Sequence, residues 1–139
     1  MRIGFAKRDV SPPVLAAGDL SIPMLGWRWE RSKAYREIHD PLHARAMAVE
    51  SGGATAVIFA CDLFGDAVGF GNRCAAGLQA RRGVPAAHVF FSCSHTHLGY
   101  ICSLEAFRIG GYEIGPGTWS WLAAGAGEAI AQCAIAAAR

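Results

Sequence analysis

The sequence predicts an α/β fold in which helices flank a mixed β-sheet. The prediction depends on the order of segments, because apolar runs of strand length come before and after a helix-like segment. A second observation is that the chain ends on a helix, where such a pattern normally returns to the sheet. The 139 residues have the length of one domain. We therefore expect a single segment, 1–139, that forms an incomplete part of a larger α/β domain.

The first element is a strand followed by a long loop. Residues 2–10 are predicted to form a strand, and Ser11-Pro12-Pro13 ends it because proline cannot donate a hydrogen bond to a sheet. Residues 14–38 contain glycines, a proline and no sustained period, so they are predicted to form a loop.

A β-hairpin is predicted next. Residues 44–50 and 55–63 are strand-like runs, and the connection between them contains Gly52 and Gly53, which can adopt positive φ. The second run includes the continuously apolar residues 56–61, which is typical of a strand buried on both faces.

The second half of the chain predicts a helix, a strand and a final helix. Residues 71–82 suit a helix, with Asn72 as a candidate N-cap and Gly83 as the residue that ends it. Residues 89–93 predict another buried strand. A glycine-rich loop follows, and the last helix is predicted to run from Thr118 to the C-terminus.

Composition excludes several classes of protein. Hydrophobic residues make up 53% of the chain and charged residues only 17%, which excludes a disordered protein and predicts an apolar face that meets another chain or a further part of the same fold. The net charge of +2 with scattered basic residues gives no nucleic-acid footprint, and no segment suits a membrane span. Five cysteines in apolar runs, without a secretory signal, favour reduced thiols in the cytoplasm.

The sharpest chemical feature is His95-Thr96-His97 at the end of a predicted strand. Side chains at i and i+2 of an extended strand share a face, so both imidazoles could reach one metal ion. A hydrogen-bonded structural pair is the alternative. Cys93 would share that face as well, either in a mixed thiolate and imidazole site or as a nucleophile, although a buried free cysteine is the simpler interpretation.

Other candidates precede or follow the predicted hairpin strands. His39 and Asp40 could pair as an imidazole and its orienting carboxylate, although Asp-Pro also starts turns. His43 is a further candidate. Asp62 follows a buried strand, where a carboxylate is either functional or a cap for the next segment.

Four stretches in the right order resemble the N-terminal part of the catalytic domain of the neutral, non-lysosomal ceramidase family. They are Gly4 to Pro13, the Ile38-His39-Asp40-Pro41-Leu42-His43-Ala44-Arg45-Ala46 stretch, Cys61-Asp62-Leu63, and Arg82-Gly83-Val84-Pro85 leading to Ser94-His95-Thr96-His97 and Gly99. The resemblance implies a zinc-dependent hydrolase of a linear amide, with His95 as a zinc ligand and His97 in the same site. The family's other ligands, a His, a Glu and a Tyr, come from downstream sequence. The family continues with Ser-Gly-Pro where this chain has Leu98-Gly99-Tyr100.

These expectations lead to one main hypothesis and two alternatives. The main hypothesis is a subunit or N-terminal fragment of a zinc amide hydrolase, in which His95 and His97 bind the metal, and His97, His39 and Asp62 are the catalytic candidates. A second protein chain or missing sequence would complete the site around a small-molecule amide. One alternative is a non-catalytic assembly module that retains the fold. The other is a homo-oligomer whose site is completed by His39 or Asp62.

Overall fold

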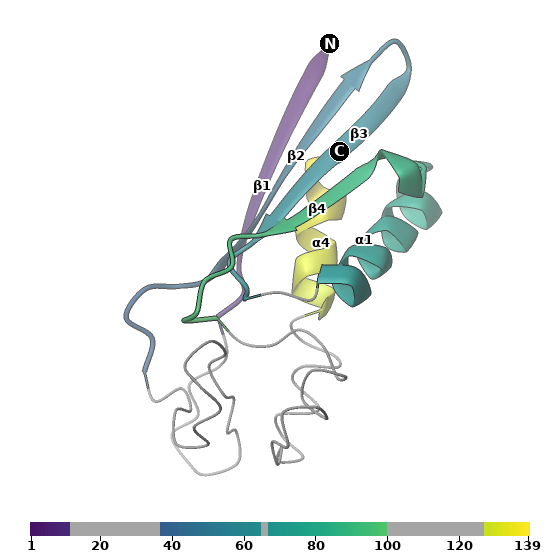
Figure 1. Ribbon diagram of the computed structural model, residues 1–139. Helices are drawn as coiled ribbons and strands as arrows, with labels where there is room; N and C mark the ends of the chain where they lie inside the picture. The colour runs from purple at the N-terminus through teal and green to yellow at the C-terminus, as the bar shows by residue number, and fades with distance from the viewer. Residues whose placement is uncertain (12–36, 65–66, 100–126) are drawn as a thin grey trace.

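The computed structural model describes residues 1–11, 37–64, 67–99 and 127–139 (Figure 1). Four strands, two α-helices and one short 3-10 helix lie in these residues. In chain order they are β1 (Arg2–Asp9), β2 (His43–Ser51), β3 (Ala54–Cys61), α1 (Ala67–Arg82), η1 (Ala86–His88), β4 (Val89–Cys93) and α4 (Gly127–Ala137). Among the described helices, none is both long enough and apolar enough to cross a membrane.

The four described strands form one mixed sheet, as predicted, and their order in it is β1-β2-β3-β4. The pairs β1/β2 and β2/β3 are antiparallel, whereas β3 and β4 are parallel and are joined through α1. The predicted hairpin is confirmed, because Gly52 and Gly53 adopt φ of 60° and 80° in the turn between β2 and β3. Only glycine adopts such angles without strain, so these two residues set the register of the hairpin.

Both helices pack on one face of the sheet, and the core lies between them and the strands (Figure 1). Its largest fully buried side chains are Phe59, Leu63, Leu78, Val57, Cys61 and Cys74. Burial of each large apolar side chain contributes roughly 1.5–3 kcal/mol to stability. The side chains of the sheet that face α4 are small. At Gly4 there is no room for a larger residue, because an added Cβ would lie only 2.7 Å from the Ala137 carbonyl oxygen. Close packing of α4 therefore depends on glycine and alanine in β1 and β2.

The opposite face of the sheet carries an apolar row that no described residue covers. The register aligns Phe5 with Met47, Met47 with Ile58, and Ile58 with Phe90, so these four side chains cross all four strands. Phe5 is 76% exposed, Ile58 46% and Phe90 64%. We call the surface made by these four residues and Ile3 the open face. A shallow hollow of about 460 Å³ on it is lined by Phe5, Ala6, Lys7, Arg45, Ala46, Met47, Ile58 and Ala60.

The prediction that residues 56–61 are buried on both faces is wrong for the described part of the chain. β3 was expected to be buried on both faces, but its side chains alternate, with Val57, Phe59 and Cys61 in the core and Ile58 exposed. A run of apolar residues cannot distinguish a strand covered on both faces from one whose second apolar face meets no described residue.

The prediction of the first helix, at residues 71–82, is confirmed in part. α1 ends at Arg82 with Gly83 at φ 67°, as expected for a glycine that ends a helix. It begins at Ala67 rather than near residue 71, so Asn72 lies inside the helix and is not its N-cap. Packing of Cys74 and Leu78 against the sheet outweighs the modest helix penalty of an exposed Asn. The loop at 14–36, the glycine-rich loop and the predicted helix start at Thr118 lie outside the described residues.

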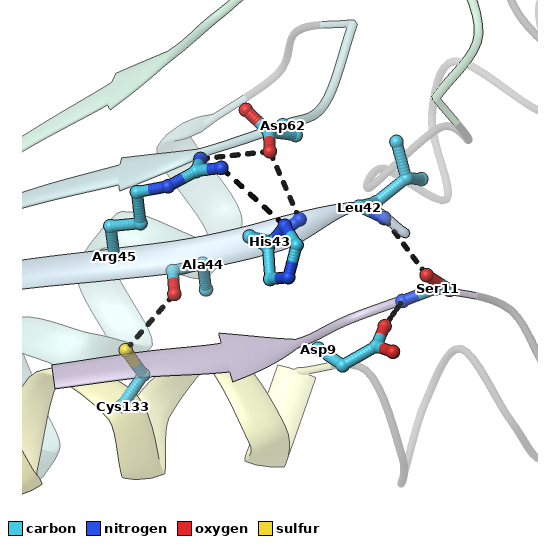
Figure 2. Close-up of polar contacts among 8 residues, drawn as sticks. All are labelled: Asp9, Ser11, Leu42, His43, Ala44, Arg45, Asp62 and Cys133. Atoms are coloured by element: carbon cyan, nitrogen blue, oxygen red, sulfur yellow. Dashed lines mark hydrogen bonds and ion pairs between the residues drawn. The ribbon is translucent and has the colours of Figure 1, made fainter. Parts of the chain in front are cut away.

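The cysteines in the described part of the chain are free thiols, as predicted. They are Cys61, Cys74, Cys93 and Cys133, and Cys102 lies outside the described residues. Cys133 of α4 donates a hydrogen bond of 3.4 Å to the Ala44 carbonyl oxygen of β2 (Figure 2). Burial raises the pKa of the Cys61 thiol and that of the Cys74 thiol, the latter to about 12. Both groups are therefore protonated and poor nucleophiles at neutral pH.

Candidate functional site

The candidate site lies where β3 and β4 end. The two strands are parallel, so the segments that follow them leave the sheet at the same edge. The Ser94 N–H donates a 2.9 Å hydrogen bond to the Cys61 carbonyl oxygen, which ties the start of one segment to the end of the other strand. Ligand sites of α/β proteins commonly form at such carboxyl ends.

Three aromatic rings meet at this edge. The ring of Phe64 stacks on His95 with centroids 4.5 Å apart, and it meets His97 edge-on at 5.0 Å. The two imidazoles are themselves 5.4 Å apart at 73°. Both histidines are exposed and Phe64 is partly buried. We call these three side chains the aromatic cluster.

The histidines converge in a way that the sequence pattern did not predict. β4 ends at Cys93, so His95 and His97 are not alternate residues of an extended strand. Instead His95 adopts φ 60°, in the left-handed region, and the chain turns at residues 97–98. A non-glycine residue in that region costs roughly 1–2 kcal/mol, and such strain concentrates at functional sites.

The turn that carries both histidines is packed tightly against the segment after β3. A Cβ at Gly99, which is buried, would lie 3.0 Å from Thr96 Cγ2, 3.1 Å from the Asp62 carbonyl oxygen and 3.2 Å from Leu63 Cα. The Leu98 N–H donates a 3.2 Å hydrogen bond to Thr96 Oγ1 within the turn. Glycine at position 99 is therefore required for this close approach.

Asp62 joins β2 to the end of β3 at the same edge (Figure 2). Its Oδ2 accepts hydrogen bonds from the His43 N–H at 3.0 Å and from Arg45 Nη1 at 2.8 Å, and its own N–H donates to the His43 carbonyl oxygen at 2.9 Å. Arg45 Nη2 lies 3.4 Å from His43 Nδ1. Asp62 thus holds the segment that leads to Phe64, and its carboxylate is already engaged by an arginine and a backbone amide.

A second polar link fixes the start of β2 to the end of β1. The Ser11 N–H donates to Asp9 Oδ1 at 2.8 Å, and Ser11 Oγ accepts from the Leu42 N–H at 2.8 Å (Figure 2). The hydrogen bonds from Ser11 hold the pKa of the Asp9 carboxyl below its ordinary value. The Val10 N–H donates to the Leu42 carbonyl oxygen, which completes the link.

The structure does not bring His39 to the aromatic cluster. His39 is 95% exposed and pairs with Asp40, Nδ1 to Oδ2 at 2.8 Å, and this partner raises the pKa of the imidazole. Cys93 lies in register beside Cys61, which is in the core. Within the described ranges, no group of three or more histidine, cysteine or acidic side chains is arranged to hold a metal ion. A site made by Cys93 with both histidines is therefore not formed by these residues.

Phe64 is the residue of this site that sequence reasoning missed. It lies two residues after Asp62, directly at the strand end where a site was expected. The only usable signal was that position, because a phenylalanine beside an apolar run is indistinguishable in sequence from a core residue.

Comparisons with known proteins identify the fold. No protein-family model matches the sequence, and no curated protein sequence matches it. Among solved structures, neutral ceramidase from Pseudomonas aeruginosa matches 97% of this chain with a TM-score of 0.73 and 20% sequence identity, over 21% of its own length. A ceramidase complexed with C2 matches 98% of this chain with a TM-score of 0.70 and 21% identity, over 20% of its length. The chain therefore has the fold of about one fifth of a neutral ceramidase, which confirms the family resemblance at the level of fold.

Proposed function

We propose that this chain supplies two imidazole ligands, His95 and His97, to the zinc site of an amide hydrolase. The observation that carries the proposal is their convergence at the carboxyl ends of two parallel strands, with His95 held in a strained backbone conformation. Support comes from the fold shared with neutral ceramidase.

The spacing of the two rings fits a shared zinc ion. With Zn–N bonds of about 2.0–2.1 Å and a tetrahedral angle, two bound imidazoles have centroids about 5 Å apart. The centroids of His95 and His97 lie 5.4 Å apart. A catalytic zinc has about three protein ligands and one open position. We propose that a second chain or further sequence supplies the remaining ligands.

The residues of this chain would have different roles at the site. When bound, the metal would polarise the amide carbonyl and supply a hydroxide at neutral pH. His95 and His97 would bind it, with His97 also adjoining the substrate. Asp62 would hold the segment between β3 and the aromatic cluster through Arg45 and the His43 amide. The substrate class we propose is a linear amide.

We propose that the open face packs against further polypeptide. The exposed parts of its large side chains amount to roughly 450 Å², which is in the range of functional surface patches and is a little more than half of the ~800 Å² that each partner buries in a stable complex. In both ceramidase structures, about four fifths of the polypeptide lies outside the part that this chain matches. The free thiols favour a reducing compartment, and we propose the cytoplasm.

Elemental analysis tests the metal proposal. Protein purified without chelator or affinity metal is expected to retain zinc, alone or with its partner, and His95→Asn is expected to lose it. Asn tolerates the left-handed backbone of residue 95, so this variant removes the ligand without adding strain. His39→Ala is the matched control and keeps its zinc, because His39 contacts Asp40 and not the cluster. Zinc content unchanged in His95→Asn contradicts the proposal.

The open face also favours a second candidate function, a non-catalytic assembly module. In that case Ile58→Lys, which places a charge in the middle of the apolar row, abolishes assembly, while His95→Asn changes neither metal content nor activity of the complex. Analytical ultracentrifugation of wild type and Ile58→Lys, combined with metal analysis of His95→Asn and His39→Ala, distinguishes the amide hydrolase from the assembly module. The third hypothesis is a homo-oligomer in which His39 or Asp62 completes the metal site. A protein that sediments as a monomer at micromolar concentration would contradict it.

A further inference from the structure

Phe64 contacts both candidate ligands, and we propose that it is the positioning residue that sets the orientation of the His95 and His97 imidazoles. The inference rests on the proposed metal site and goes beyond it, because it assigns the ligand geometry to an apolar side chain outside the His-Thr-His segment. Its ring stacks on His95 at 30° with centroids 4.5 Å apart and meets His97 at 68° with centroids 5.0 Å apart.

The two contacts have different geometries. His95 and Phe64 are stacked, His97 and Phe64 form an edge-to-face pair, and the two imidazoles are inclined to each other by 73°. Stacked and edge-to-face pairs with centroids 4.5–7 Å apart are the favoured arrangements of aromatic rings. One phenyl ring can therefore hold two exposed imidazoles at a fixed mutual angle.

Phe64 is itself held by rigid parts of the fold. Its neighbour Leu63 is fully buried in the core. Asp62 is bonded to β2 on one side, and Gly99 packs against the Asp62 and Leu63 backbone on the other. The ring therefore projects from a segment fixed at both the sheet and the histidine turn. A ligand pair held by such support keeps its geometry before metal binds.

The phenyl ring offers the imidazoles no hydrogen-bond partner. It acts through packing and by excluding water from one side of the ligand pair, which controls solvent access to the site. One favourable aromatic contact is worth at most about a tenfold change in an equilibrium constant. We expect zinc affinity to fall about 10-fold when the Phe64 ring is removed.

The experiment measures Zn²⁺ binding to the full chain by competition with a chromophoric chelator, for wild type, Phe64→Leu and Phe64→Tyr. Phe64→Leu is expected to weaken affinity about 10-fold, and Phe64→Tyr, which keeps the ring, to stay within about 3-fold of wild type. The matched control is Phe91→Leu, which removes a ring from the Phe59 contact in the core, with centroids 5.0 Å apart. It should lower the unfolding midpoint in urea and leave zinc affinity unchanged.

A second readout needs no metal. In the metal-free protein, NMR signals of the His95 and His97 ring protons should carry ring-current shifts that disappear in Phe64→Leu and persist in Phe64→Tyr. Unchanged histidine shifts, or equal zinc affinity of wild type and Phe64→Leu, overturn the inference. If wild type shows the ring-current shifts but no zinc binding with any partner, the proposed function fails while the positioning of the rings by Phe64 stands.

Discussion

Replacing Gly99 by alanine should displace the histidine turn from the segment it packs against. A Cβ there meets three atoms at 3.0–3.2 Å, closer than ordinary van der Waals contact. Two of them, the Asp62 carbonyl oxygen and Leu63 Cα, belong to backbone held by the sheet and the core, so they cannot move aside. The third atom, Thr96 Cγ2, belongs to a side chain.

The expected change in stability of Gly99→Ala is the sum of two opposing contributions. Overpacking at a rigid site costs about 1–3 kcal/mol, and the loss of chain freedom in the unfolded state when glycine becomes alanine returns about 0.4–1 kcal/mol. A net loss of about 1–2 kcal/mol lowers Tm by roughly 3–8 °C in a domain of this size. The displaced turn also separates His95 and His97 from Phe64, so zinc affinity should fall with it.

Urea unfolding and zinc competition on the same preparations provide the assay. Gly69→Ala is the matched control, because Gly69 lies in α1 with nothing within 4 Å of an added Cβ. It should stabilise the protein by about 0.5–1 kcal/mol through helix propensity and leave zinc affinity alone. Stability of Gly99→Ala within about 0.5 kcal/mol of wild type would refute the close packing of the turn.

Two further predictions concern the polar link at β2 and the buried thiols. Asp62→Ala should lose about 1–2 kcal/mol of stability in urea unfolding, because it leaves the His43 backbone amide without its acceptor. Arg45→Ala should lose less than about 1 kcal/mol, because the half-exposed arginine side chain is well solvated. Equal losses in the two variants would contradict this reasoning. Burial raises the pKa of Cys74 from 9.0 to about 12. The folded state favours the neutral thiol, so its contribution is complete below pH 9 and is lost as pH rises towards 12. Unfolding free energy should therefore fall by roughly 1 kcal/mol from this group between pH 8 and pH 10, and Cys74→Ala should show a smaller fall.

Local signals in the sequence predicted most of the described secondary structure. Gly52 and Gly53 mark a turn that only glycine adopts easily, and Gly83 marks the end of α1, so both boundaries could be located from residue type alone. These features depend on neighbouring residues, and a single sequence contains that information.

Features that depend on contacts between distant segments could not be predicted. Apolar composition does not reveal which face of β3 the helices cover, so the exposure of Ile58 was missed. The His95 and His97 pair was predicted, but on the assumption of an extended strand, whereas a left-handed residue and the packing of Gly99 bring the rings together. Phe64 joins them only because β3 and β4 end at one edge, which requires the sheet topology.

The central claim is that His95 and His97 bind one zinc ion together. X-ray absorption at the zinc edge, on the zinc-loaded protein with any partner it retains, measures the ligands directly. Wild type is expected to show a first shell at about 2.0–2.1 Å that includes two imidazoles from this chain, and the bound zinc and its imidazole signal are expected to be lost in His95→Asn and in His97→Asn. A zinc shell that is unchanged in both variants, or that contains no imidazole, would contradict it.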